Sequence, residues 1–292
     1  YINQDLSIAK KYPPVWEELV EFIDVGIFGS LQSYPPPLHK NYKFFLPDTF
    51  APDSQAYPDS LRKFQNFNLG LAANNKAFAK SINLQSLIEA INLICIGQFK
   101  INSVSKTVIH VLKEFLYPKY KKRRQLIYPI LGFDVFWKHY LEFKPSFSTF
   151  FTNHLASVMH RYWYDLFPDD YESDKEPSLF NSQSIIKALD ISDKQVGTIL
   201  KFIRNQNTDL WILSSMGQKA IDRGNYIREL YLYSFSKFLK FLGVDPKKYI
   251  LLPAMQPDIC ISCASRDDLI KIQKEIKNIV DIKGKQFIYE RY

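Results

Sequence analysis

The sequence predicts an α/β fold in which helices cover a mostly parallel sheet. Apolar runs of strand length recur at 25–29, 42–46, 147–152 and 209–214, and uninterrupted runs of this kind are typical of strands buried on both faces. Between them, apolar residues recur at spacings of three and four, which indicates amphipathic helices. The alternation of these two patterns along the chain is the signature of an α/β protein.

The first sixty residues predict one helix and two strands. Pro13-Pro14 opens a helix through about residue 22, because proline is tolerated in a first helical turn. The run 25–29 predicts a short strand between turn signals. It is followed by Tyr34-Pro35-Pro36-Pro37, which cannot be helical. A second strand is expected at Tyr42 to Leu46.

The middle of the chain is nearly all helical, and we predict that it forms a cap or insertion. The core then resumes with the strand at 147–152, a helix through Trp163, and a helix over 181–205 that is broken near Asp190. The strand at 209–214 completes this part. The predicted organisation is 1–59 as part of the α/β core, 60–143 as the helical cap, 144–245 as the rest of the core, and 246–292 as a small α+β tail with strands at 249–252, 258–261 and 286–289.

Composition narrows the class of protein. The chain has 292 residues, of which 46% are hydrophobic, and no apolar run reaches the roughly 18 residues that a membrane span needs. Three cysteines favour a reducing compartment over a disulfide framework. We therefore expect a soluble, cytoplasmic protein without a transmembrane segment, although a chain that starts at Tyr1 leaves a processed or trimmed N-terminus open.

The first candidate site is the turn after the strand at 147–152. Asn153 and His154 stand directly past the strand, and His160 follows on the next helix. Polar groups beyond the carboxyl end of a strand lie where open α/β sheets bind ligands. The alternative is that both histidines are capping or core-edge residues.

Other polar residues follow the remaining strands. Thr49 lies between Asp48 and Asp53 in a proline-bounded loop, so it is a candidate nucleophile or ligand contact, and an Asx turn is the alternative. Ser215 ends the run at 209–214. Two further residues after this turn are expected to face the same cleft, namely Gln218 and Arg223.

The net charge of +8 is concentrated at Lys119, Lys121, Lys122, Arg123 and Arg124. Such a cluster can bind phosphates or an anionic membrane, and a solvated helix face is the alternative. No nucleic-acid motif accompanies it, so nucleic acid is not the favoured partner.

The pair Cys260-Ile261-Ser262-Cys263 lies in a strand-like run, which sends its two side chains to opposite faces. A structural role for these cysteines is therefore favoured over a redox or zinc site.

Several short motifs, taken in order, resemble the alkaline phosphatase superfamily in its type I phosphodiesterase branch. The first is Val25-Gly26-Ile27-Phe28-Gly29, followed by Tyr34-Pro35-Pro36, and the next is Pro47-Asp48-Thr49-Phe50-Ala51-Pro52. Lys144-Pro145 before the strand at 147–152, and His160-Arg161-Tyr162-Trp163 after it, resemble the Asp-x-x-x-His metal-ligand turn of the family. Ile212-Leu213-Ser214-Ser215-Met216-Gly217 stands where the family has Ser-Asp-His-Gly. The resemblance implies an alkaline-phosphatase-like sandwich.

The same resemblance places His160 at a metal-ligand position and implies a zinc or manganese ion as cofactor. Three positions depart from the family pattern. Ala156 replaces the ligand aspartate of this turn, and Ser215 and Met216 replace the later Asp-His pair. Serine and methionine are poor partners for zinc beside hard oxygen ligands. A standard two-metal site is therefore largely lost from this chain.

We expect a domain that recognises or processes an anionic ester or a glycan-type substrate in a cleft lined by these residues. If it is a hydrolase or transferase, His154 is the candidate general acid or base, and His160 is a metal ligand or an oxyanion stabiliser. The first alternative is a non-catalytic binding or scaffold domain with a protein partner. The second is a metal-dependent phosphodiesterase or sulfatase-like hydrolase that residues outside this chain complete.

Overall fold

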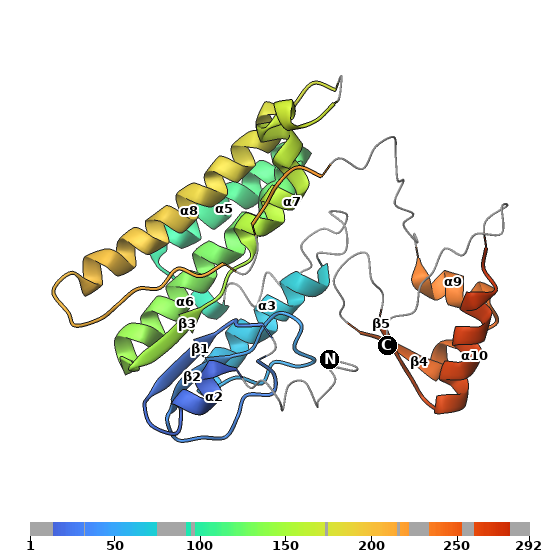
Figure 1. Cartoon of the computed structure of the whole chain (residues 1–292), viewed down its shortest axis with the longest axis horizontal. Coiled ribbons are helices and arrows are strands. Elements are labelled where there is room, and N and C mark those ends of the chain that lie inside the picture. The colour runs from blue at the N-terminus through green and yellow to red at the C-terminus, as the bar shows by residue number, and fades with distance from the viewer. Residues whose placement is uncertain are drawn as a thin grey trace. The chain divides into compact units, whose positions relative to one another are not determined.

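The computed structural model describes residues 14–31, 33–74, 92–94, 97–172, 175–214, 217–221, 234–252 and 260–280 (Figure 1). The chain divides into two compact units, which are Val15–Arg223 and a second unit made of Tyr1–Pro14 with Gly224–Tyr292. In the described part of the chain, no helix is long and apolar enough to cross a bilayer.

The larger unit is built on a parallel sheet of three strands in the order β2-β1-β3. The strands are β1 (Val25–Phe28), β2 (Tyr42–Leu46) and β3 (Phe147–Phe150). β1 is buried along its whole length, as its apolar sequence predicts, whereas β3 is only half-buried at the edge. The expectation of an α/β fold with a parallel sheet is confirmed.

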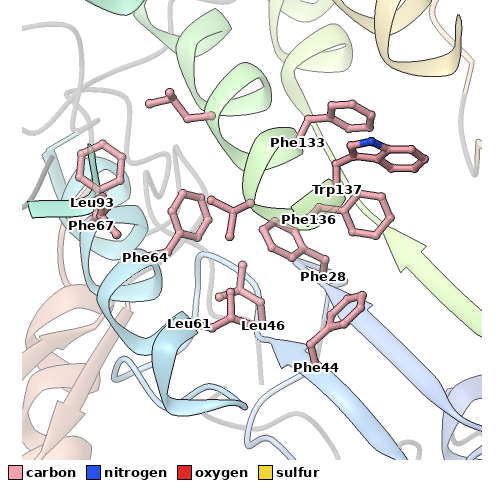
Figure 2. Packing of buried hydrophobic residues seen from close by; sticks show 12 residues of the cluster. Phe28, Phe44, Leu46, Leu61, Phe64, Phe67, Leu93, Phe133, Phe136 and Trp137 are labelled. Carbon is pink, nitrogen blue, oxygen red and sulfur yellow. The ribbon is translucent and has the colours of Figure 1, made fainter. Parts of the chain in front are cut away.

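One face of the sheet is covered by α3 (Arg62–Asn74) and α6 (Ile127–Phe143). Figure 2 shows Phe28 and Phe44 of the strands in one cluster with Phe64 of α3 and Phe136 of α6. The ring centroids of Phe28 and Phe136 are 5.8 Å apart. Leu61, Phe64, Leu131 and Phe136, which lie in the range predicted as a cap, thus belong to the same hydrophobic cluster as Phe28 and Phe44.

The opposite face is covered by the short helix α2 (Val15–Leu19) and the turn that follows it. Val20 packs here against Val25, Ile27 and Tyr42. Helices thus cover both faces of the parallel sheet, which is the arrangement that βαβ crossovers produce.

A second helical layer adjoins α6. It consists of α5 (Ile101–Leu116), the 3-10 segment η2 (Pro118–Leu126), α7 (His154–Leu166), η3 (Pro168–Asp170) and α8 (Leu179–Ile203). The core between α7 and α8 includes Val158, Tyr162 and Ile185. α8 runs on through Asp190 without the predicted break.

The run 209–214 is not a strand, which corrects the sequence prediction. Residues 209–214 have no regular structure, and the side chains of Trp211, Ile212 and Leu213 are exposed. An apolar run becomes a strand only when a neighbouring strand accepts its backbone hydrogen bonds. None of the strands in the described part of the chain pairs with residues 209–214.

The smaller unit contains an antiparallel pair beside two helices. Its elements are α9 (Phe235–Phe241), η4 (Pro246–Lys248), β4 (Tyr249–Leu252), β5 (Cys260–Cys263) and α10 (Arg266–Lys277). Its core is formed by Leu239, Val244 and Ile272. The strand predicted at 286–289 lies outside the described residues.

Candidate functional site

The strand order creates a switch point at the carboxyl edge of the sheet. The chain leaves β1 toward β2 on one side and returns as β3 on the other side. In open α/β sheets, the two sets of loops part at such a point and leave a crevice for a ligand. Gly29, Ser30, Thr152 and Asn153 follow the two strands that meet there, and we call this region the carboxyl edge.

Two hydroxyl groups join the strands at the carboxyl edge. The Oγ of Ser30 lies 2.8 Å from the Oγ1 of Thr149, and the amide of Phe151 donates to the carbonyl of Phe28. Gly29 has a φ of 70°, which is the left-handed region that favours glycine. A Cβ at Gly29 would lie in ordinary van der Waals contact with the carbonyl oxygen of Phe151, so the positive φ is what favours glycine here.

A buried polar network lies behind the ends of β1 and β2. The Nε2 of Gln65 donates to the carbonyl of Asp48 at 3.0 Å, and the Nδ2 of Asn68 donates to Oε1 of Gln65 at 3.1 Å. The side chain of Asn68 also shares a hydrogen bond with the hydroxyl of Tyr128, whose pKa is raised by burial. The network fixes α3 and α6 to the loop after β2. Buried polar groups of this kind must be paired to be tolerated.

α7 begins at the carboxyl edge with Asn153 as its N-cap residue. Asn153 is exposed, and its side chain makes no capping hydrogen bond in the described structure. The amide of Ser157 donates to the carbonyl of Asn153, as in a regular helix. The amides of the first turn therefore lack a cap from this side chain, which leaves a partial positive charge at the helix start.

His154 is a buried structural residue and is only 5% exposed. Its Nδ1 lies 2.8 Å from Oγ1 of Thr152, and its Nε2 lies 3.1 Å from the carbonyl oxygen of Ala188 and 3.3 Å from Oγ of Ser192. Burial lowers the pKa of the imidazole. The ring joins α7 to α8, as in the core-edge alternative, and both nitrogens are already engaged.

His160 lies apart from His154. It is exposed and lies roughly 120° around the axis of α7 from His154. Within the described residues, no three His, Cys, Asp or Glu side chains are grouped closely enough to hold a metal ion. The zinc or manganese ion implied by the superfamily resemblance therefore does not fit the residues around His160.

Thr49 is half-buried in the loop after β2, between two capped turns. The Oδ1 of Asp48 accepts from the amide of Phe50 at 2.8 Å, and Oδ1 of Asp53 accepts from the amide of Gln55 at 2.9 Å. These are the Asx turns that were the alternative to a nucleophile. Thr49 and Asn153 both follow the carboxyl ends of strands, with β1 between those strands.

The remaining predicted site residues are Ser215, Gln218 and Arg223. Ser215 and Arg223 lie outside the described residues. Gln218 is half-buried, and its Nε2 donates to the carbonyl of Lys219 at 3.1 Å. Since 209–214 is not a strand, the argument that Gln218 follows a strand end no longer applies.

The basic cluster at 119–124 is not simply a solvated face. Arg123 is buried, and its guanidinium lies 3.7 Å from the ring centroid of Phe180. Arg124 pairs with the buried carboxylate of Glu114. These two arginines hold η2 in place, and the lysines of the segment supply its exposed charge.

The sequence interpretation missed the hydroxyl pair and the polar network. Ser30 directly follows Gly29, the turn glycine after β1, and that signal could have identified it. Gln65, Asn68 and Tyr128 lie on helices that the sequence assigned to a cap, so their approach to the sheet was not foreseeable. Cys263, in β5, is free and half-buried, and burial raises the pKa of its thiol.

Comparisons of the chain with protein-family models, with curated proteins and with solved structures found no match.

Proposed function

We propose that Val15–Arg223 is an anion-recognition domain that binds a phosphate or sulfate ester, or an anionic glycan, at the carboxyl edge. The observation that carries the proposal is the strand order β2-β1-β3, because it sets a switch point beside β1. The uncapped start of α7 and the hydroxyls of Ser30 and Thr149 border this point. Such groups complement negative charge.

We further propose that the domain is a degenerate relative of the alkaline phosphatase superfamily, in its type I phosphodiesterase branch. The order of elements supports this. α2 and β1 are followed by the Tyr34-Pro35-Pro36 loop, and β2 leads into Pro47-Asp48-Thr49. β3 leads into α7, which carries His160-Arg161-Tyr162-Trp163. Helices on both faces of the sheet agree with a sandwich of that kind.

Recognition is favoured over catalysis because His154 has no free ring nitrogen for proton transfer. Both nitrogens have partners on the protein, and burial disfavours the charged imidazolium. The backbone amides and hydroxyl groups at the carboxyl edge are hydrogen-bond donors, which would orient an anion.

The proposal is tested by Asn153→Asp, with binding of phenyl phosphate and phenyl sulfate measured by titration calorimetry. An aspartate at this position repels an anion, and we expect affinity to fall about tenfold. The same aspartate is a good N-cap, so the melting temperature should not fall. Gln183→Glu is the matched control, because it adds the same charge to the exposed surface of α8.

Two results would contradict the proposal. One is equal binding of the probes by the wild type and Asn153→Asp. The other is hydrolysis of bis(p-nitrophenyl) phosphate together with stoichiometric zinc or manganese, measured by mass spectrometry, that is lost in His160→Ala. The second result would instead support a metal-dependent hydrolase.

A further inference from the structure

α5 is oriented with its polar side toward the protein. Its buried residues are Ser103 and Glu114, and Thr107 and His110 are half-buried on the same side. Only Val104 and Val111 add partly buried apolar side chains. A surface helix ordinarily turns its apolar face to the core, so this orientation is inverted.

The outward side of α5 is apolar. Phe115 is 87% exposed, Leu116 is 66% exposed and Leu112 is 57% exposed. At 100° per residue, the exposed apolar residues of the helix fall within an arc of about 120°. We call this surface the α5 apolar face, which consists of Ile101, Val108, Ile109, Leu112, Phe115 and Leu116.

Positive charge borders the α5 apolar face. Lys106 and Lys113, seven positions apart, are exposed along one border of the arc. At the end of α5, the exposed Lys119 lies with its Nζ 5.2 Å from the ring centroid of Phe180. Burial and then the charges of Arg123 and Lys113 lower the pKa of Lys187 on α8. Lys119 of η2 thus lies near the start of α8, and Lys187 of α8 is close enough to Lys113 to interact with its charge.

No exposed acidic side chain offsets these cations between residues 100 and 124. The only acid in this stretch is Glu114, which is buried and paired with Arg124 and His110. Burial alone would raise the pKa of this carboxyl, but hydrogen bonds from His110 and Arg124 outweigh it and lower the pKa to about 2. The charged side chains that α5 and η2 expose are thus all cationic.

We propose that α5 and η2 dock on an anionic lipid bilayer, with α5 lying in the plane of the interface. A helix with one apolar side and bordering lysines suits this position, because the apolar side chains enter the acyl boundary and the lysines meet anionic headgroups. A second copy of this surface would bring like charges together. A nucleic acid would leave Phe115, Leu116 and Leu112 without an apolar partner. An anionic bilayer offers partners both for the α5 apolar face and for the lysines that border it.

The test is flotation of the full chain with vesicles of phosphatidylcholine alone or with one third phosphatidylglycerol. We expect binding to the anionic vesicles only, weakened by added salt. The double variant Leu112→Ser/Phe115→Ser should bind at least about tenfold more weakly, since two large apolar side chains leave the interface. Lys106→Glu/Lys113→Glu should lose a similar factor.

The control variants change exposed residues elsewhere on the larger unit. Phe22, which is 84% exposed, is changed to serine, and Lys201 on α8 is changed to glutamate. Both controls should bind like the wild type. All the substituted side chains are exposed, so circular dichroism and the melting temperature should not change in any variant.

Several outcomes overturn the proposal. They are no flotation of the wild type, equal flotation with neutral vesicles, and flotation that Leu112→Ser/Phe115→Ser leaves unchanged. A dimer in analytical ultracentrifugation that this variant abolishes would assign the surface to a second copy. Retarded migration of RNA that Lys106→Glu/Lys113→Glu abolishes, without vesicle binding, would assign it to nucleic acid.

Discussion

Gly26 makes room for the packing of Phe44 at the centre of the sheet. The two residues are register partners on β1 and β2. A Cβ added to Gly26 would lie 2.3 Å from the Cζ atom of the Phe44 ring. Phe44 is fully buried against α6, so its ring has little freedom to withdraw. The glycine is therefore required by close approach rather than by an unusual backbone conformation.

Gly26→Ala is expected to lower the free energy of unfolding by about 1–3 kcal/mol, because it overpacks the core. Urea denaturation measures this change. Gly197→Ala in α8 is the matched control, since a Cβ there would meet no heavy atom within 4 Å in the described chain. That variant should gain about 0.5–1 kcal/mol. Equal effects of the two substitutions would contradict the packing argument.

At the scale of elements, Arg123 connects η2 to α8. Its Nε donates to Oγ of Ser184 at 2.9 Å, and its Nη2 donates to the carbonyl of Phe180. The guanidinium also lies over the ring of Phe180. Burial lowers the pKa of Arg123. Planar stacking together with two directed hydrogen bonds is a combination that lysine cannot reproduce.

Arg123→Lys is expected to destabilise the protein by about 1–3 kcal/mol, because it loses the stack and leaves buried acceptors unpaired. Thermal unfolding followed by circular dichroism is the measurement. Arg204→Lys, at the exposed end of α8, should change stability by less than about 0.5 kcal/mol. If both variants melt like the wild type, η2 is not held by this arginine.

Strands were predictable where an apolar run also has a neighbouring strand. The runs that contain Val25–Phe28, Tyr42–Leu46 and Phe147–Phe150 were found because each is short and bounded by turn residues. The run around Trp211 is also short and apolar, but it is exposed and has no regular structure. Periodicity reports which residues are apolar and contains no information on hydrogen-bond partners, so it could not separate these cases.

The candidate site was located from the sequence only in part. Asn153 was correctly placed beyond a strand end, because strand and helix patterns meet there. The burial of His154 was not predictable, since its partner Ala188 comes from α8, 34 positions away. The inverted orientation of α5 was also invisible, because an amphipathic pattern does not say which side faces the protein.

At the scale of the whole molecule, buried titratable groups make stability depend on pH. Burial lowers the pKa values of His139 and His154, so each is neutral when folded but takes up a proton near pH 6.5 when unfolded. The two neutral histidines make their full contribution to the free energy of unfolding above about pH 6.5. This contribution is lost as the pH falls toward the pKa values of the folded state. Glu114, with a pKa of about 2, adds a second loss in more acid solution.

We therefore expect the free energy of unfolding to be level above about pH 6.5 and to fall below it, by up to about 1.4 kcal/mol per pH unit for each histidine. Urea titrations between pH 5 and pH 8 provide the measurement. His154→Gln should reduce the slope between pH 6.5 and pH 5. His160→Gln, which removes an exposed imidazole, is the control. A slope that His154→Gln leaves intact would refute the assignment.

The central position of β1 has a consequence for biosynthesis. The hydroxyl pair of Ser30 and Thr149 joins residues 119 positions apart. One edge of β1 therefore stays unpaired until the intervening helices and β3 have been translated. The ring of Phe28 likewise stays uncovered until Phe136 and Phe150, which pack against it, have been translated. A nascent chain therefore emerges from the ribosome with an unpaired strand edge and exposed aromatic rings, which are features that chaperones shield. Completion of the sheet must be a late, slow event, since contacts so distant in sequence form slowly.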